Sequence, residues 1–119
     1  MSARTLAEEL LARASEDWLT AAEVIDVARQ SGLTDPSDLR DLSVGLISRL
    51  VATGLLVPGE YDGTEHRPWD CSHGEAIARI AEDWAARRDP FVMPGEIVWF
   101  DTSPEGQRVG QAVLEREAE

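Results

Sequence analysis

Four residues that could do metal or thiol chemistry lie close together in the middle of the chain: His66, Asp70, Cys71 and His73. Imidazole, carboxylate and thiolate groups are the usual zinc ligands, but zinc sites normally show paired ligands such as C-x-x-C or H-x-x-x-H. Neither spacing occurs in this segment. We therefore expect a polar loop without a bound metal, and no cofactor.

Cys71 is the single cysteine, so an internal disulfide is excluded. It precedes a predicted helix start at Ser72, a position that can activate a thiol, although such a cysteine is more often a small buried hydrophobe. Pairing Cys71 with His73 as nucleophile and base finds no support, because no oxyanion motif accompanies them. The chain also lacks a glycine-rich phosphate loop and a nucleophile elbow. We expect no enzymatic activity.

The strongest chemical signal is acidity. The chain has 23 acids against 11 bases, a formal net charge of −12 and a pI of about 4.4, and every base is an arginine. Proteins that bind nucleic acid neutralise phosphates with basic side chains, so this balance argues against nucleic acid and anionic membranes and favours a basic protein partner. The candidate partner-binding residues are Asp38, Asp41, Glu60, Asp62, Glu65 and Trp69.

Trp69 belongs to this set because tryptophan is enriched at interface hot spots and because it lies in the polar stretch Arg67-Pro68-Trp69-Asp70. The alternative is that its ring folds back and covers the seam between the following helix and the sheet, as large aromatics in loops usually do.

The elements that must position these residues can be predicted from periodicity and caps. A first amphipathic helix covers residues 6–14, and a capping box at residues 20–23 starts a second helix, which Gly32 closes. Asp35 and Pro36 start a third helix, which Gly54 closes. Residues 55–57 form a short strand, Pro58-Gly59 a turn and residues 60–70 a loop. A second capping box starts a helix over 73–88, residues 97–100 form a buried strand, and a last helix starts at 102–105.

The fold class expected from this order is α+β: one mostly helical winged-helix-like domain over residues 1–119, with a small β-hairpin or sheet and an extra helix between the wing strands. The alternative for residues 20–53 is an ordinary helical hairpin. The segment Trp99-Phe100-Asp101-Thr102-Ser103-Pro104-Glu105-Gly106 resembles the passage from the second wing strand to the last helix of winged-helix regulators. The resemblance covers residues 5–57 and 97–116.

In such a domain the acids of the third helix, Asp35, Asp38 and Asp41, and those of the wing, Glu60, Asp62 and Glu65, are expected to form one negative face. Trp18, Trp84 and Trp99 are expected in the core.

As a whole the chain resembles small acidic proteins of high-GC bacteria, some of which are similar to immunity proteins of contact-dependent inhibition systems. This resemblance implies a cytoplasmic protein that binds and blocks a basic toxin domain such as a nuclease, without catalytic residues of its own. A cytoplasmic location also fits the absence of an export signal and of an apolar run near the roughly 20 residues of a membrane helix. The alternative function is that of a winged-helix DNA-binding transcriptional regulator, and a homodimer is compatible with either function.

Overall fold

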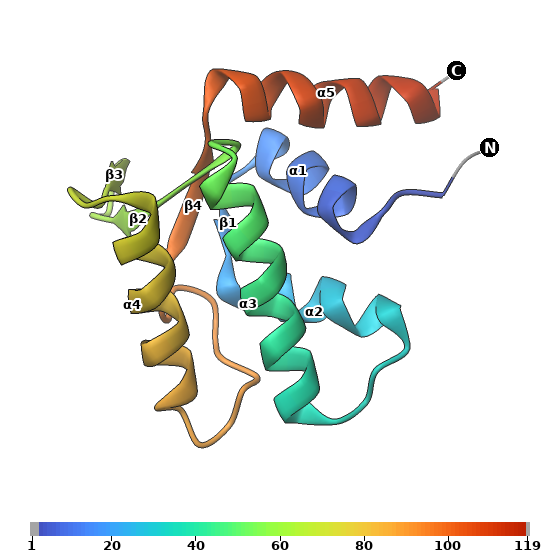
Figure 1. Cartoon of the computed structure of the whole chain (residues 1–119). Helices are drawn as coiled ribbons and strands as arrows, with labels where there is room; N and C mark the ends of the chain where they lie inside the picture. The colour runs from blue at the N-terminus through green and yellow to red at the C-terminus, as the bar shows by residue number, and fades with distance from the viewer. Residues whose placement is uncertain (1–2, 119) are drawn as a thin grey trace.

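The computed structural model describes residues 3–118, which form helices packed on one face of a four-stranded antiparallel sheet (Figure 1). The helices are α1 (Leu6–Glu16), α2 (Ala21–Ala28), the 3₁₀ turn η1 (Arg29–Ser31), α3 (Pro36–Ala52), α4 (His73–Ala85) and α5 (Pro104–Ala118). The strands are β1 (Leu19–Thr20), β2 (Leu56–Tyr61), β3 (His66–Pro68) and β4 (Trp99–Thr102). None of the helices in residues 3–118 is long and apolar enough to cross a membrane.

The predicted helix starts are confirmed. Each of them depends on hydrogen bonds between residues that are close in the sequence. The Thr20 hydroxyl accepts a hydrogen bond from the backbone N–H of Glu23, and the Ser72 hydroxyl accepts one from that of Glu75. In both capping boxes the glutamate carboxylate accepts a hydrogen bond from the backbone N–H of the capping residue. Asp35 accepts from the backbone N–H of Asp38 at 3.0 Å, with a proline at the first helical position. A further capping box that the sequence analysis did not predict, Thr5 with Glu8, starts α1.

The strand order in the sheet is β1-β4-β2-β3. Strands β4 and β2 are the two central strands of the sheet, and β3 and α4 lie between them in the chain. Figure 1 shows α4 alongside α3, on the side opposite α2. The predicted fold class is therefore confirmed: the domain is α+β and mostly helical, with a small sheet and an extra helix between two of its strands.

The prediction was wrong around Pro58. Pro58 and Gly59 do not form a turn but lie inside β2. There they pair with Phe100 and Trp99 of β4, and both are buried. Tertiary pairing overrides the local turn preference here. The chain from 60 to 70 is likewise not one loop, because β2 continues to Tyr61 and pairs with β3.

Two other predicted boundaries also move. The strand expected over 97–100 begins only at Trp99, because Ile97 has a φ of 74°, in the left-handed region that is incompatible with a strand and rare for a β-branched residue. The helix expected to reach residue 88 ends at Ala85. There the chain turns back so that the carbonyl of Pro90 accepts a 2.9 Å hydrogen bond from the indole of Trp84, which is fully buried as predicted.

The core lies between the helices and the inner face of the sheet. Its largest fully buried side chains include Leu10, Leu19, Ile47, Ile80 and Phe100.

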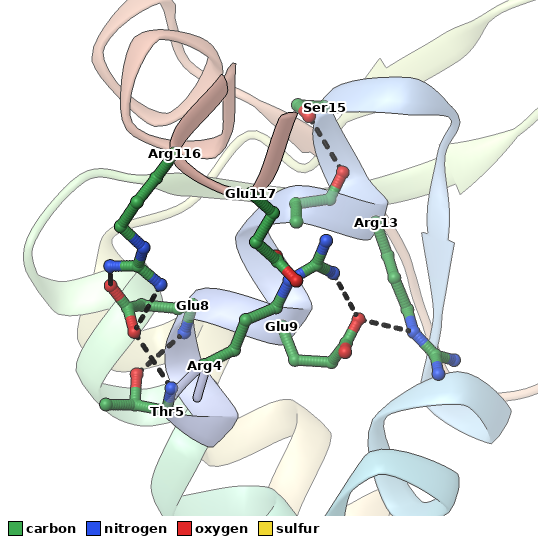
Figure 2. Close-up of polar contacts among 9 residues, drawn as sticks. Arg4, Thr5, Glu8, Glu9, Arg13, Ser15, Arg116 and Glu117 are labelled. Carbon is green, nitrogen blue, oxygen red and sulfur yellow. Dashed lines mark hydrogen bonds and ion pairs between the residues drawn. The ribbon is translucent and has the colours of Figure 1, made fainter. Parts of the chain in front are cut away.

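The last helix, α5, packs directly on α1, so that the two ends of the described chain lie side by side (Figure 1). A Cβ on Gly110 would lie 2.4 Å from the carbonyl oxygen of Leu11, so only glycine allows this close approach. Ion pairs cross the same seam: Arg116 bonds Glu8 at 2.9 Å, and Arg4 bonds Glu117 (Figure 2).

Candidate functional site

An aromatic cluster covers the outer face of the sheet, the face turned away from the helices. Side chains alternate across a strand, so Phe100 points into the core while its neighbour Trp99 points outward. Tyr61 lies 5.4 Å from Trp99 and 4.9 Å from Trp18, measured between ring centroids, and His66 lies 6.4 Å from Trp18. We call these four residues the aromatic ridge.

Gly59 makes the ridge possible. It pairs with Trp99 on one side and Pro68 on the other, and a Cβ there would lie 2.8 Å from Cε1 of His66. The missing side chain leaves room for the His66 ring to reach over β2, so that its Nε2 atom lies 2.9 Å from the carbonyl oxygen of Trp99. The ridge is therefore tied to the backbone and pre-ordered.

Part of the ridge is open to solvent. Tyr61 keeps 41% of its surface exposed, and Trp18, His66 and Trp99 are half-buried. Trp18 and Trp99 are thus not the core residues that the sequence analysis predicted. Large apolar groups that remain exposed on a folded surface commonly mark interaction sites.

Two acid-lined hollows flank the ridge. The first, of about 250 Å³, adjoins Trp18 and is lined by Glu16, Asp17 and Asp101 among others. The second, of about 350 Å³, lies beside Tyr61 and Trp99, and its charged lining residues are Glu60, Asp83 and Arg79. Glu60 forms an ion pair with Arg79 at 3.3 Å, which leaves Asp83 as the acid that pairs with no other residue of this lining. Aromatic faces between carboxylates are a setting in which a cationic side chain can stack and form an ion pair at once.

The hairpin that carries Tyr61 is held by Asp62. One carboxylate oxygen accepts from the backbone N–H groups of Thr64 and Glu65, both at 2.9 Å, and the other accepts from Arg67. The Glu65 and Thr64 N–H groups, and then the Arg67 guanidinium, hold the pKa of the Asp62 carboxyl well below its usual range. Asp62 therefore acts first as a turn-forming residue.

The structure does not gather the predicted acids into one face. Asp38 and Asp41 are exposed at the amino-terminal end of α3, which lies at the bottom of Figure 1. Glu60, Asp62 and Glu65 lie in the β2–β3 hairpin, at the left of Figure 1 and toward the carboxyl-terminal end of α3, while α4 packs alongside α3. The two groups of acids therefore lie toward opposite ends of α3 and do not form one negative face.

Trp69 folds back onto the domain, which is the alternative to an exposed hot spot given in the sequence analysis. Its ring is half-buried against the core, and the guanidinium of Arg79 on α4 stacks over it at 3.8 Å. Its backbone N–H donates to the carbonyl of Pro58 at 3.1 Å. Trp69 thus connects α4 to the sheet. That Trp69 also contacts a partner stays a prediction.

Most of the arginines are neutralised within the chain. Among residues 3–118, eight of the eleven form ion pairs: Arg4, Arg13, Arg40, Arg67, Arg79, Arg87, Arg108 and Arg116. Arg29 instead stacks on Phe91 at 4.4 Å. The described surface therefore offers few cations for phosphate, and its excess charge is negative.

The residues considered for metal chemistry diverge. His66 belongs to the aromatic ridge, whereas Cys71 is exposed and lines a 280 Å³ hollow with His73. Within residues 3–118 no three His, Cys, Asp or Glu side chains are grouped as metal ligands.

The sequence analysis missed the ridge because its members are brought together only by strand pairing. The available signal was the alternation in β4, which allows just one of Trp99 and Phe100 to point inward. Comparison of the chain with protein families, curated proteins and solved structures found no match. The family resemblances drawn from the sequence accordingly stay predictions.

Proposed function

We propose that the protein is a small acidic binding module that takes up a basic protein partner on the aromatic ridge, as an immunity protein or antitoxin takes up a toxin domain. The observation that carries the proposal is the partly exposed ridge of Trp18, Tyr61 and Trp99 between acid-lined hollows. Tryptophan and tyrosine supply most of the binding energy at many interfaces, and opposite charge accelerates encounter.

A nuclease domain is the partner class that best fits this chemistry. Its active site must attract phosphate and is therefore basic. An acidic protein whose arginines are largely paired internally is steered toward such a surface and blocks it.

The second candidate is DNA binding, which the winged-helix order of α1, α2, α3 and the sheet favours. Two features oppose it. Asp35 and Asp38 occupy the start of α3, the end that usually meets base edges, and α4 packs along α3. We expect no sequence-selective shift of duplex DNA at physiological salt and sub-micromolar protein; such a shift would favour the regulator.

The partner proposal is tested by capture and kinetics. Wild-type protein and Tyr61→Ala are used as baits, captured proteins are identified by mass spectrometry, and binding of the purified candidate is measured by surface plasmon resonance. Removing a hot-spot aromatic costs about 2 kcal/mol, so affinity for the partner should fall roughly 30-fold.

The matched control is Leu33→Ala, because Leu33 is also 41% exposed but lies between η1 and α3, outside the ridge. Tyr61→Phe, which keeps the ring, should bind nearly as wild type. Equal affinity of wild type and Tyr61→Ala for every captured basic protein would place the interface elsewhere.

A further inference from the structure

A second site, unrelated to the aromatic ridge, lies where α1, the carboxyl-terminal half of α3 and α5 meet. It is a groove of about 560 Å³, within the range of small-molecule sites. Its apolar walls include Leu6, Leu11, Leu46, Leu50, Leu55 and Val109. Several of these side chains are only half-buried, so the groove exposes aliphatic surface that the fold itself does not cover.

The groove also contains an arginine that has no carboxylate partner among residues 3–118. Arg49 lines it, is exposed, and forms no ion pair with any residue in the part of the chain that the structure describes. This contrasts with the eight arginines that are paired with carboxylates. The positive charge of an arginine without a carboxylate partner, beside apolar surface, attracts an anion to this part of an otherwise acidic chain.

The acid on the rim of the groove does not cancel this attraction. Glu8 accepts hydrogen bonds from both terminal nitrogens of Arg116, at 2.9 and 3.4 Å, and from the backbone of Thr5. The Arg116 hydrogen bond and then the Thr5 bond lower the pKa of Glu8 to about 2. The Glu8 charge is thus matched by its own arginine, and Arg49 remains as the cation available to a ligand (Figure 2 shows the Glu8–Arg116 pair).

We propose that this groove binds an aliphatic carboxylate, a fatty acid of medium chain length, with the hydrocarbon chain along the leucines and the carboxylate on the guanidinium of Arg49. Burial of the hydrocarbon chain supplies the free energy of binding, in proportion to the apolar surface removed from water. The charge-assisted hydrogen bonds from Arg49 fix the orientation and select the anion. The negative charge of the rest of the surface repels such an anion, so binding is favoured at Arg49.

The test uses dodecanoate below its micellar concentration, with binding to the full chain measured by isothermal titration calorimetry. Arg49→Gln should weaken dodecanoate binding about tenfold, which corresponds to about 1.4 kcal/mol, and should leave binding of dodecanol unchanged. Arg88→Gln is the matched control: it removes the same charge from an exposed arginine without an ion pair in residues 3–118, outside the groove, and should bind as wild type.

A second variant tests the walls. Ala7→Phe fills the groove from α1 and should abolish binding of both ligands, while thermal melting confirms that the variant is folded. Equal dodecanoate affinity for wild type and Arg49→Gln overturns the proposal, as does the absence of dodecanoate binding to wild type. A concentration-dependent dimer that is disrupted by Ala7→Phe, without dodecanoate binding, would assign the groove to a second copy of the chain instead. Because the ridge is not involved, failure here leaves the proposed function standing.

Discussion

Replacement of Gly59 by alanine tests the reasoning that the aromatic ridge depends on a missing side chain. The new Cβ would lie 2.2 Å from the carbonyl oxygen of Arg67 and 2.8 Å from the Arg67 carbonyl carbon and from Cε1 of His66. The nearest of these atoms is backbone, so rotation of a side chain cannot relieve the clash. Strand β3 must move away by about 0.8 Å to restore a 3.0 Å contact, and the ladder between Gly59 and Pro68 is strained.

Overpacking of this kind costs about 1–3 kcal/mol, and we place Gly59→Ala near the upper end because a hydrogen-bonded strand has to shift. For a chain of this length such a loss lowers the melting temperature by roughly 10 °C. The hydrogen bond between His66 and the Trp99 carbonyl should weaken at the same time, which changes the tryptophan fluorescence of the folded state.

Thermal melting followed by far-ultraviolet circular dichroism measures the effect. Gly45→Ala is the control, because Gly45 is exposed inside α3 and a Cβ there meets nothing within 4 Å. That change should stabilise the protein by about 0.5–1 kcal/mol, since alanine is the better helix former. If Gly59→Ala melts within about 2 °C of wild type, the packing argument for the ridge is wrong.

Two further predictions concern charged side chains. The pKa of Glu8 is lowered from 4.5 to about 2, so its contribution to stability is present above pH 4.5 and is lost as the pH falls from 4.5 to 2. Glu8→Gln should therefore melt lower than wild type at pH 7, and the difference should shrink toward zero as the pH falls through 2, whereas Glu82→Gln, at an exposed position of α4 without an ion pair in residues 3–118, should melt as wild type at pH 7. Asp62→Ala should speed amide hydrogen exchange at Thr64 and Glu65, which lose their acceptor, while Asp62→Asn should retain most of the protection; unchanged exchange in Asp62→Ala would show that the carboxylate does not hold the turn.

The features that could be predicted from the sequence are those with a local cause. The starts of α2, α3 and α4 follow from hydrogen bonds between residues three apart, and such bonds form wherever the side chains allow them. The burial of Trp84 follows from its position on the apolar stripe of α4. The order of these elements was then enough to predict the fold class.

The features that could not be predicted depend on which strands meet. Pro58-Gly59 has the composition of a turn, and only its pairing with β4 and β3 makes it part of a strand. The same pairing brings Tyr61 beside Trp99, residues that periodicity within either segment cannot relate. The separation of Asp38 from Asp62 depends on how the β2–β3 hairpin is placed relative to the start of α3, which neither segment specifies alone.

The position of β4 in the sheet has a consequence for how the chain is made. β4 is the last strand in the sequence, yet it lies between β1 and β2 and is the strand that pairs with both. Before β4 has been synthesised, the edges of β1 and β2 have no common partner strand, and the apolar surface around Leu19 and Leu56 stays uncovered. The sheet is completed only when residues 99–102 have left the exit tunnel. Helix α5, which follows β4, can then pack on α1. The four-stranded sheet thus cannot form until residues 99–102 have been synthesised, and a chain that stalls or is truncated before them presents open strand edges that chaperones and proteases recognise.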